Sequence, residues 1–230
     1  MRFRHAANQL RFIARVWVTL AIDAQRFFPR PRRGAGREQR WGQKSMARIE
    51  YGIVENIPPD VLSALDGKDL LNVFRMMLHS PRMMGSAAIL GVVGLLESTL
   101  DPVSRELLIL SCGLRFQADY EWDQHVSISD MAGVTGEQRA ALLAGDIDAD
   151  CFSDADQALL RFTGVVAASP IVSDAEFADI RAHFTDRQVV EVVMLIGFYF
   201  LLGRVATVFE VESDPRPGDE VLNAGVRATA

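Results

Sequence analysis

The sequence predicts an all-α fold, and two observations in its 230 residues lead to that prediction. From Ile57 onward no segment alternates apolar and polar residues as a β-strand does, whereas apolar residues recur repeatedly with the helical period of 3.6. In addition, a Ser/Thr-x-x-Glu/Gln pattern, typical of the first turn of a helix, occurs at Thr135, Ser173 and Thr185. We expect one domain of about eight helices over residues 46–212.

The first four expected helices follow one another with clear boundaries. The first ends before Ser80-Pro81, and the second is rich in small residues, which permit close helix packing. The third begins at Asp101-Pro102, where Asp can cap the free N–H groups and Pro lacks one. The fourth stops at Gly133, a residue type that commonly ends helices. These helices are expected at residues 70–79, 82–97, 101–116 and 119–132.

The later helices are expected to begin near Thr135, Ser153, Ser173 and Thr185. The last contains the longest apolar run, Val189–Leu202, with Glu191 inside it. Fourteen residues are too few for a membrane span, so we expect this helix to be the central buried one. Residues 213–230 are expected to form a polar C-terminal tail.

The net charge of −6 conceals two unlike parts of the chain. Residues 1–45 hold eleven Arg or Lys against two acids, a net of +9, which leaves 13 basic and 28 acidic residues, a net of −15, for the remainder. A basic amphipathic segment can lie on an anionic membrane, serve as a transit peptide or hold nucleic acid. We instead expect residues 1–45 to be an extension upstream of a start at Met46, because the composition changes there.

Composition also limits the chemistry of the acidic domain. Its two cysteines, Cys112 and Cys151, cannot form a disulfide framework, and no Cys/His cluster has the spacing of a structural zinc site. An acidic domain is poorly suited to nucleic acid. We therefore expect a cytoplasmic protein without metal or cofactor, without a nucleic-acid partner and without a membrane span.

Few ionisable residues interrupt the apolar helices, and these are the candidates for catalysis. Glu121 and His125 are four residues apart, so they share one helix face, where a carboxylate can orient an imidazole for acid–base work. A solvent-exposed Glu–His pair is the alternative interpretation of this spacing. Glu106 lies on the preceding helix and reaches His125 only if the two helices form a hairpin, which the spacing does not establish. Trp122 is interpreted as a core or interface residue, with a substrate platform as the alternative.

Five short segments resemble the carboxymuconolactone decarboxylase family, which includes the alkylhydroperoxidase D (AhpD) branch. Together they span about residues 70–211, and their order and spacing are more specific than any one of them. The resemblance implies an all-α fold and assembly as a homotrimer or homohexamer. The segments are Asn72-Val-Phe-Arg75 with Ser80-Pro81, Arg105-Glu-Leu-Leu-Ile-Leu110, Tyr120-Glu-Trp-Asp-Gln-His125, Ala132-Gly-Val134 and Arg187-Gln-Val-Val-Glu-Val-Val193.

The resemblance also separates two functions. The peroxidase branch carries a Glu, a Cys-x-x-Cys pair and a His four residues after the second Cys. Glu106 and His125 match the Glu and the His, but Ala118 and Glu121 occupy the two cysteine positions. A dithiol peroxidase needs one thiolate to attack the peroxide and a second thiol to resolve it, so a peroxidase is disfavoured.

The decarboxylase branch, which resembles this chain in keeping Glu-x-x-x-His, implies a cofactor-free lyase or isomerase. Its substrate would be a small carboxylated lactone or another enolisable acid. We expect His125 to supply or shuttle the proton while Glu106 and Glu121 orient and tune it. The expected substrate-binding residues are Arg105, as a carboxylate-holding cation, together with Tyr120 and Trp122. Two alternatives stay open, a peroxidase-like protein using Cys112 and a non-catalytic oligomeric binding module.

Overall fold

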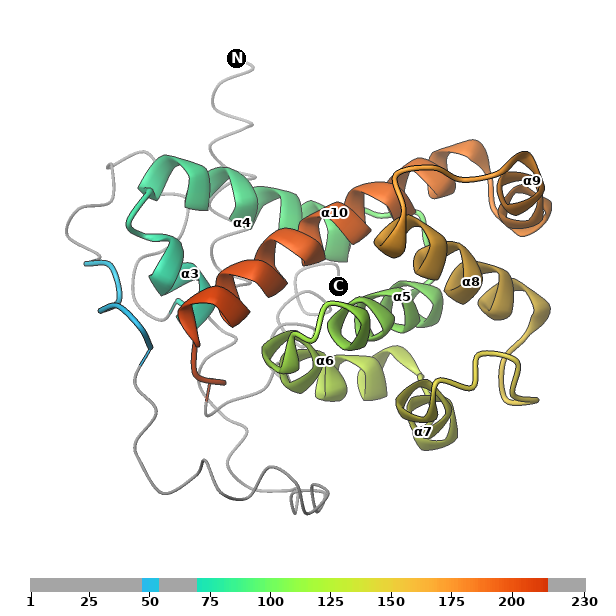
Figure 1. Cartoon of the computed structure of the whole chain (residues 1–230), viewed down its shortest axis with the longest axis horizontal. Coiled ribbons are helices and arrows are strands. Elements are labelled where there is room, and N and C mark those ends of the chain that lie inside the picture. Colours follow the sequence, from blue (N-terminus) through green and yellow to red (C-terminus); the bar gives the residue numbers. More distant parts are fainter. Residues whose placement is uncertain (1–46, 54–69, 215–230) are drawn as a thin grey trace, which may run out of the picture.

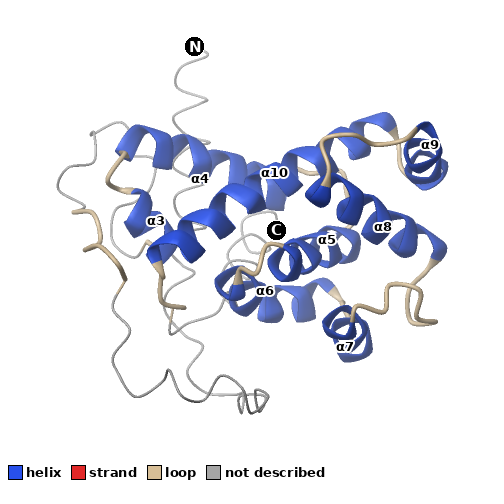
Figure 2. Cartoon of the chain, in the orientation of Figure 1, coloured by secondary structure: helices blue, strands red, loops and turns tan. Residues whose placement is uncertain are grey.

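The computed structural model describes residues 47–53 and 70–214, and these contain eight α-helices and no strand (Figures 1 and 2). The predicted all-α fold is therefore confirmed. The expectations for residues 1–45 and for most of the tail after 213 lie outside the described residues. The helices are α3 (Asn72–Met77), α4 (Pro81–Leu96), α5 (Pro102–Arg115), α6 (Asp119–Ala132), α7 (Gly136–Ala144), α8 (Asp154–Ala168), α9 (Asp174–His183) and α10 (Asp186–Phe209).

Helix α10 runs along most of the length of the molecule and connects its two ends (Figure 1). At one end it packs against α3 and α4, and at the other against α8 and α9. Helices α5 and α6 lie beneath its middle and pack extensively against each other, while α5 also packs against α8. Helix α5 is therefore packed against α6, α8 and α10 at once.

The helix buried on every side is α5, not α10 as the apolar run suggested. All residues from Ser104 to Gly113 of α5 are buried. In α10 one stripe reaches the surface, including Val190 at 58% and Met194 at 52% exposure. By length and hydropathy α10 is the one described helix that could cross a membrane, but the core helix of a soluble protein meets the same criterion. Length and hydropathy do not distinguish these cases.

The predicted helix starts are confirmed by the hydrogen bonds of their capping residues. The capping boxes at Thr135, Ser173 and Thr185 are complete, and Asp101 accepts a hydrogen bond from the Ser104 backbone N–H at 3.0 Å. The structure adds a fourth box, in which Asp156 replaces Glu or Gln as the partner of Ser153. Each box satisfies backbone donors that the first turn leaves free.

A tight turn at residues 116–118 makes α5 and α6 a hairpin. Gln117 adopts the left-handed conformation with φ 55°, and Arg204 of α10 donates a hydrogen bond from Nη1 to the Phe116 carbonyl oxygen at 3.0 Å. A Cβ atom at Gly203 would lie 3.0 Å from the Cβ of Ala118, so glycine permits the close approach of α10 to this turn. The hairpin brings the middle of α6 beside α5.

Candidate acid–base site

Glu106 of α5 and His125 of α6 meet inside the protein. The Nδ1 atom of His125 lies 2.8 Å from Oε2 of Glu106, whose side chain is fully buried. The hairpin produces this contact, because it places the inner faces of the two helices against each other. The sequence named both residues, and the structure brings them into direct contact.

Tyr199 of α10 completes the surroundings of the imidazole and was not among the residues that the sequence singled out. Its hydroxyl lies 3.1 Å from Nε2 of His125, and the two rings meet edge to face with centroids 5.2 Å apart. Burial, followed by the nearby charges of Glu106 and Glu121, raises the pKa of Tyr199 well above its ordinary value. The only hint in the sequence is that Tyr199 and Glu191 are the two polar side chains in the long run of apolar residues.

Arg105 supplies a buried positive charge next to this pair. Its Nε donates to Oε1 of Glu106 at 3.2 Å, and its side chain is only 7% exposed. Among the described residues, neither of its Nη groups makes a hydrogen bond. Glu106 thus accepts from Arg105 on one oxygen and contacts His125 on the other, while two guanidinium nitrogens stay available.

Glu121 lies one turn from His125 but makes no hydrogen bond to it among the described residues. The side chain is buried, and its Oε1 has no hydrogen-bond partner. Burial raises the pKa of Glu121 from 4.5 to about 7, with His125 acting in the opposite direction. The Nδ1 atom of His125 is instead engaged by Glu106.

The contacts of Tyr120 and Trp122 hold parts of the fold together. The Tyr120 hydroxyl lies 2.5 Å from Oδ2 of Asp214, so it fastens the segment after α10 to the first turn of α6. Trp122 is half-buried and packs against the smaller core cluster, where Leu107, Leu110 and Leu160 meet. Their substrate-binding roles therefore gain no support from these contacts.

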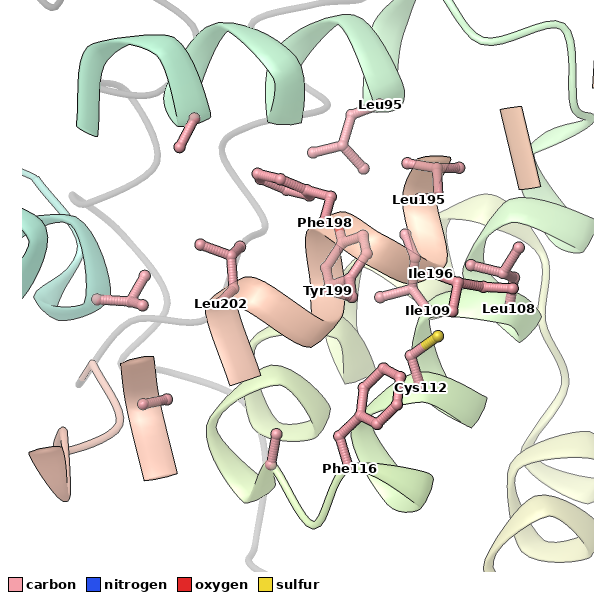
Figure 3. Packing of buried hydrophobic residues seen from close by; sticks show 14 of the residues in the cluster. Leu95, Leu108, Ile109, Cys112, Phe116, Leu195, Ile196, Phe198, Tyr199 and Leu202 are labelled. Atoms are coloured by element: carbon pink, nitrogen blue, oxygen red, sulfur yellow. The ribbon is translucent and has the colours of Figure 1, made fainter. Parts of the chain in front are cut away.

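The thiol of Cys112, in the α5–α6 hairpin, is buried among apolar side chains. Cys112 lies among Ile109, Phe116, Ile196 and Tyr199 in the main core (Figure 3). Burial raises the pKa of its thiol to about 12, with Arg115 acting in the opposite direction. A nucleophilic cysteine needs a lowered pKa and access to its reactant, so this environment does not favour thiolate chemistry.

In the described part of the chain no metal-binding group forms around His125, and the surface hollow at α9 lies elsewhere. Among the described residues, no group of three or more His, Cys, Asp or Glu side chains is arranged to hold a metal ion. A hollow on the described surface is lined by α9 residues, including Asp174, Phe177 and Arg181, rather than by the acid–base cluster. The cluster itself offers a carboxylate–imidazole–phenol chain, a buried cation and an unpaired carboxyl oxygen, which suit proton transfer to a small anion.

No family model matches the sequence, and no curated protein does. Solved structures are similar in fold. An AhpD-core, peroxidase-related protein from Ralstonia eutropha has a TM-score of 0.62 at 22% identity, over 80% of this chain and 98% of that one. A protein of unknown function from Agrobacterium tumefaciens, described as a putative antioxidant defence protein AhpD, has a TM-score of 0.54 at 20% identity, over 59% and 92%.

The debrominase Bmp8, solved in complex with 2,3,4-tribromopyrrole, is also similar to this chain. Its TM-score is 0.55 at 13% identity, over 70% of this chain and 84% of that one. At these identities the likeness establishes a shared fold, whereas function depends on the residues of each site.

Proposed function

We propose that this chain, whose fold is that of the AhpD-like proteins, is a cofactor-free lyase or isomerase acting on a small carboxylated lactone or another enolisable acid. The observation that carries the proposal is the buried contact of 2.8 Å between Glu106 and His125, with Arg105 on the second Glu106 oxygen. This arrangement supplies a proton-transfer group, a carboxylate that holds it and a cation for an anionic substrate.

The proposed reaction balances without a redox partner. Arg105 anchors a carboxylate of the substrate through its Nη groups. The bond between a substrate carbon and a carboxylate breaks, CO₂ leaves, and the electron pair passes into an enolate or dienolate. A proton delivered through His125 then adds to carbon, and solvent restores the proton to the site. An isomerase would use the same proton transfer without loss of CO₂.

A peroxidase is the competing enzyme, and the environment of the thiols argues against it. Ala118 and Glu121 stand at the two cysteine positions of the redox motif, and Cys112 is fully buried with its pKa raised to about 12. The similar solved structures that carry peroxidase-related descriptions are about one-fifth identical to this chain, so their chemistry does not transfer with the fold.

The outer face of α10 supports a homo-oligomer, expected as a trimer or hexamer. Its exposed apolar residues follow one another at helical spacing, and an apolar stripe of this kind commonly marks an interface. Light scattering of the protein, compared with a Val193→Lys, Met194→Lys variant, measures whether a second copy covers this face. The residues are Val190, Val193, Met194, Leu201 and Val208.

The test of the activity is a screen of lactone acids and β-keto acids for CO₂ release and for isomerised product. We expect His125→Ala to lower the rate by about 100-fold or more, which is typical for loss of a general acid or base. His183→Ala, at the exposed end of α9, is the matched control and should leave the rate unchanged. An equal rate in the His125→Ala protein contradicts the mechanism. Absence of turnover throughout the screen favours the non-catalytic oligomeric module instead.

A further inference from the structure

The oxygen Oε1 of Glu121 is a buried polar atom without a partner. Three such side-chain oxygens occur in the described part of the chain, on Glu121, Ser127 and Thr163, and only that of Glu121 belongs to an ionisable group. Buried polar groups are normally hydrogen-bonded, because leaving one unpaired costs free energy. An unpaired oxygen beside a candidate acid–base pair therefore has an open hydrogen-bonding position for a ligand.

His125 cannot offer that hydrogen bond in this arrangement. Its Nδ1 is engaged by Glu106 and its Nε2 by the Tyr199 hydroxyl, so both nitrogens of the ring already have partners. A ligand that approached the imidazole directly would have to displace one of them. The carboxyl of Glu121 lies one helical turn away on α6. A ligand that binds its Oε1 displaces no hydrogen-bond partner.

The groups around Glu121 come from three helices. Cys112 faces it from α5 and Tyr199 from α10, while Tyr120 and His125 lie on its own helix, α6. Cys112, Tyr199 and Tyr120 carry no positive charge that would stabilise a Glu121 carboxylate. His125 is already paired with Glu106. Burial accordingly dominates and raises the pKa of Glu121 to about 7. A neutral carboxyl group has one O–H donor, which a carboxylate lacks.

We propose that Glu121 is the substrate-facing acid of this site, whose carboxyl group binds an oxygen of a small carboxylate ligand, while Glu106, His125 and Tyr199 form a separate hydrogen-bonded chain beside it. The inference rests on the proposed function and assigns its final proton transfer to a different residue. Glu121 gives its proton to the carbon of the enolate and becomes a carboxylate. It then regains a proton from solvent.

The experiment measures binding separately from turnover. The probe is 5-oxotetrahydrofuran-2-carboxylate, a lactone acid that is ionised throughout the range, titrated by calorimetry between pH 5.5 and 8.5. In the unaltered protein we expect Kd to rise about tenfold per pH unit above pH 7, because an ionised Glu121 loses its donor and repels the ligand. In Glu121→Gln, whose amide keeps a donor, Kd should stay constant over this range. Glu137→Gln, at an exposed position of α7, should behave as the unaltered protein does.

The inference fails if Glu121→Gln retains the pH dependence of the unaltered protein, or if the probe does not bind to the folded protein at any pH. Circular dichroism and the melting temperature establish that the variant is folded. Binding that depends on Glu121, without CO₂ release or isomerisation of any substrate, supports this inference and contradicts the proposed function. CO₂ release with an unchanged rate and pH profile in Glu121→Gln supports the function and contradicts the inference.

Discussion

The Nδ1 atom of His125 lies 2.8 Å from Oε2 of Glu106, although the two residues are 19 positions apart and belong to different helices. On the opposite side of the ring, the Tyr199 hydroxyl is within 3.1 Å of Nε2. A carboxylate only accepts hydrogen bonds, and burial raises the pKa of Tyr199 so that its hydroxyl stays a donor. These two partners select one tautomer of a neutral His125.

We expect neutral His125 to carry its proton on Nδ1 and to accept from Tyr199 on Nε2. Long-range ¹⁵N–¹H correlation spectra distinguish the two nitrogens of each histidine. Tyr199→Phe should leave the proton on Nδ1, since Glu106 still accepts it, and exposed His183 provides the reference signal. A proton found on Nε2 in the unaltered protein contradicts the donors expected for the two hydrogen bonds to the ring.

Replacing Glu106 by Ala should destabilise the protein severely. Arg105 and His125 would then be buried without the carboxylate that contacts both, and breaking a buried pair costs about 3–5 kcal/mol. Urea unfolding measures the loss. Glu210→Ala, which breaks the exposed pair of Arg48 and Glu210, should cost less than about 1 kcal/mol. Similar losses for the two variants would show that the Glu106 cluster contributes little to the fold.

The sequence was sufficient for the helices but not for the whole site. Helix starts are local, so Asp101, Thr135 and Thr185 could be identified from a few neighbouring residues, and the structure contains all three caps. The Asp156 box was missed because the expected pattern specifies Glu or Gln at that position. Local chemistry therefore predicts element boundaries with few errors.

Contacts between distant helices could not be predicted in the same way. Glu121 and His125 share a helix face, yet Glu106 from another helix engages the Nδ1 of His125. Tyr199 resembled a core residue because its neighbours in sequence are apolar. The burial of α5 also exceeds that of the more apolar α10, because position in the bundle, rather than hydropathy alone, decides exposure. Contacts between helices and the burial of each helix depend on how the helices pack.

Cys112 should resist alkylation in the folded protein. Its side chain is fully buried and its pKa is raised to about 12, so little thiolate forms at neutral pH. In a Cys151→Ser variant, which removes the other, half-exposed thiol, iodoacetamide at pH 7 should give no labelled native protein. Mass spectrometry after labelling in urea should show one label. Rapid labelling of the native variant would restore the peroxidase alternative.

Tyr120→Phe should affect stability rather than ligand binding. The hydroxyl lies 2.5 Å from Asp214, which also accepts from the Asn72 backbone N–H at 3.1 Å. A hydrogen bond to a charged group contributes about 1.5–3 kcal/mol, so we expect a loss of this size in urea unfolding. Calorimetric titration with the lactone acid should give an unchanged Kd. A large rise in Kd without loss of stability would return Tyr120 to the substrate-binding residues.

The pH dependence of stability should reveal the buried carboxyl of Glu121. Its pKa is 4.5 ordinarily and about 7 in the folded protein, so the native state binds more protons than the unfolded state between these values. The contribution of Glu121 to the unfolding free energy should therefore fall as the pH rises from about 4.5 through 7, by an amount on the order of 3 kcal/mol. Glu121→Gln removes this contribution, so urea unfolding from pH 5 to 8 should show the variant gaining stability relative to the unaltered protein. Parallel curves for the two proteins would mean that Glu121 ionises normally in the folded state.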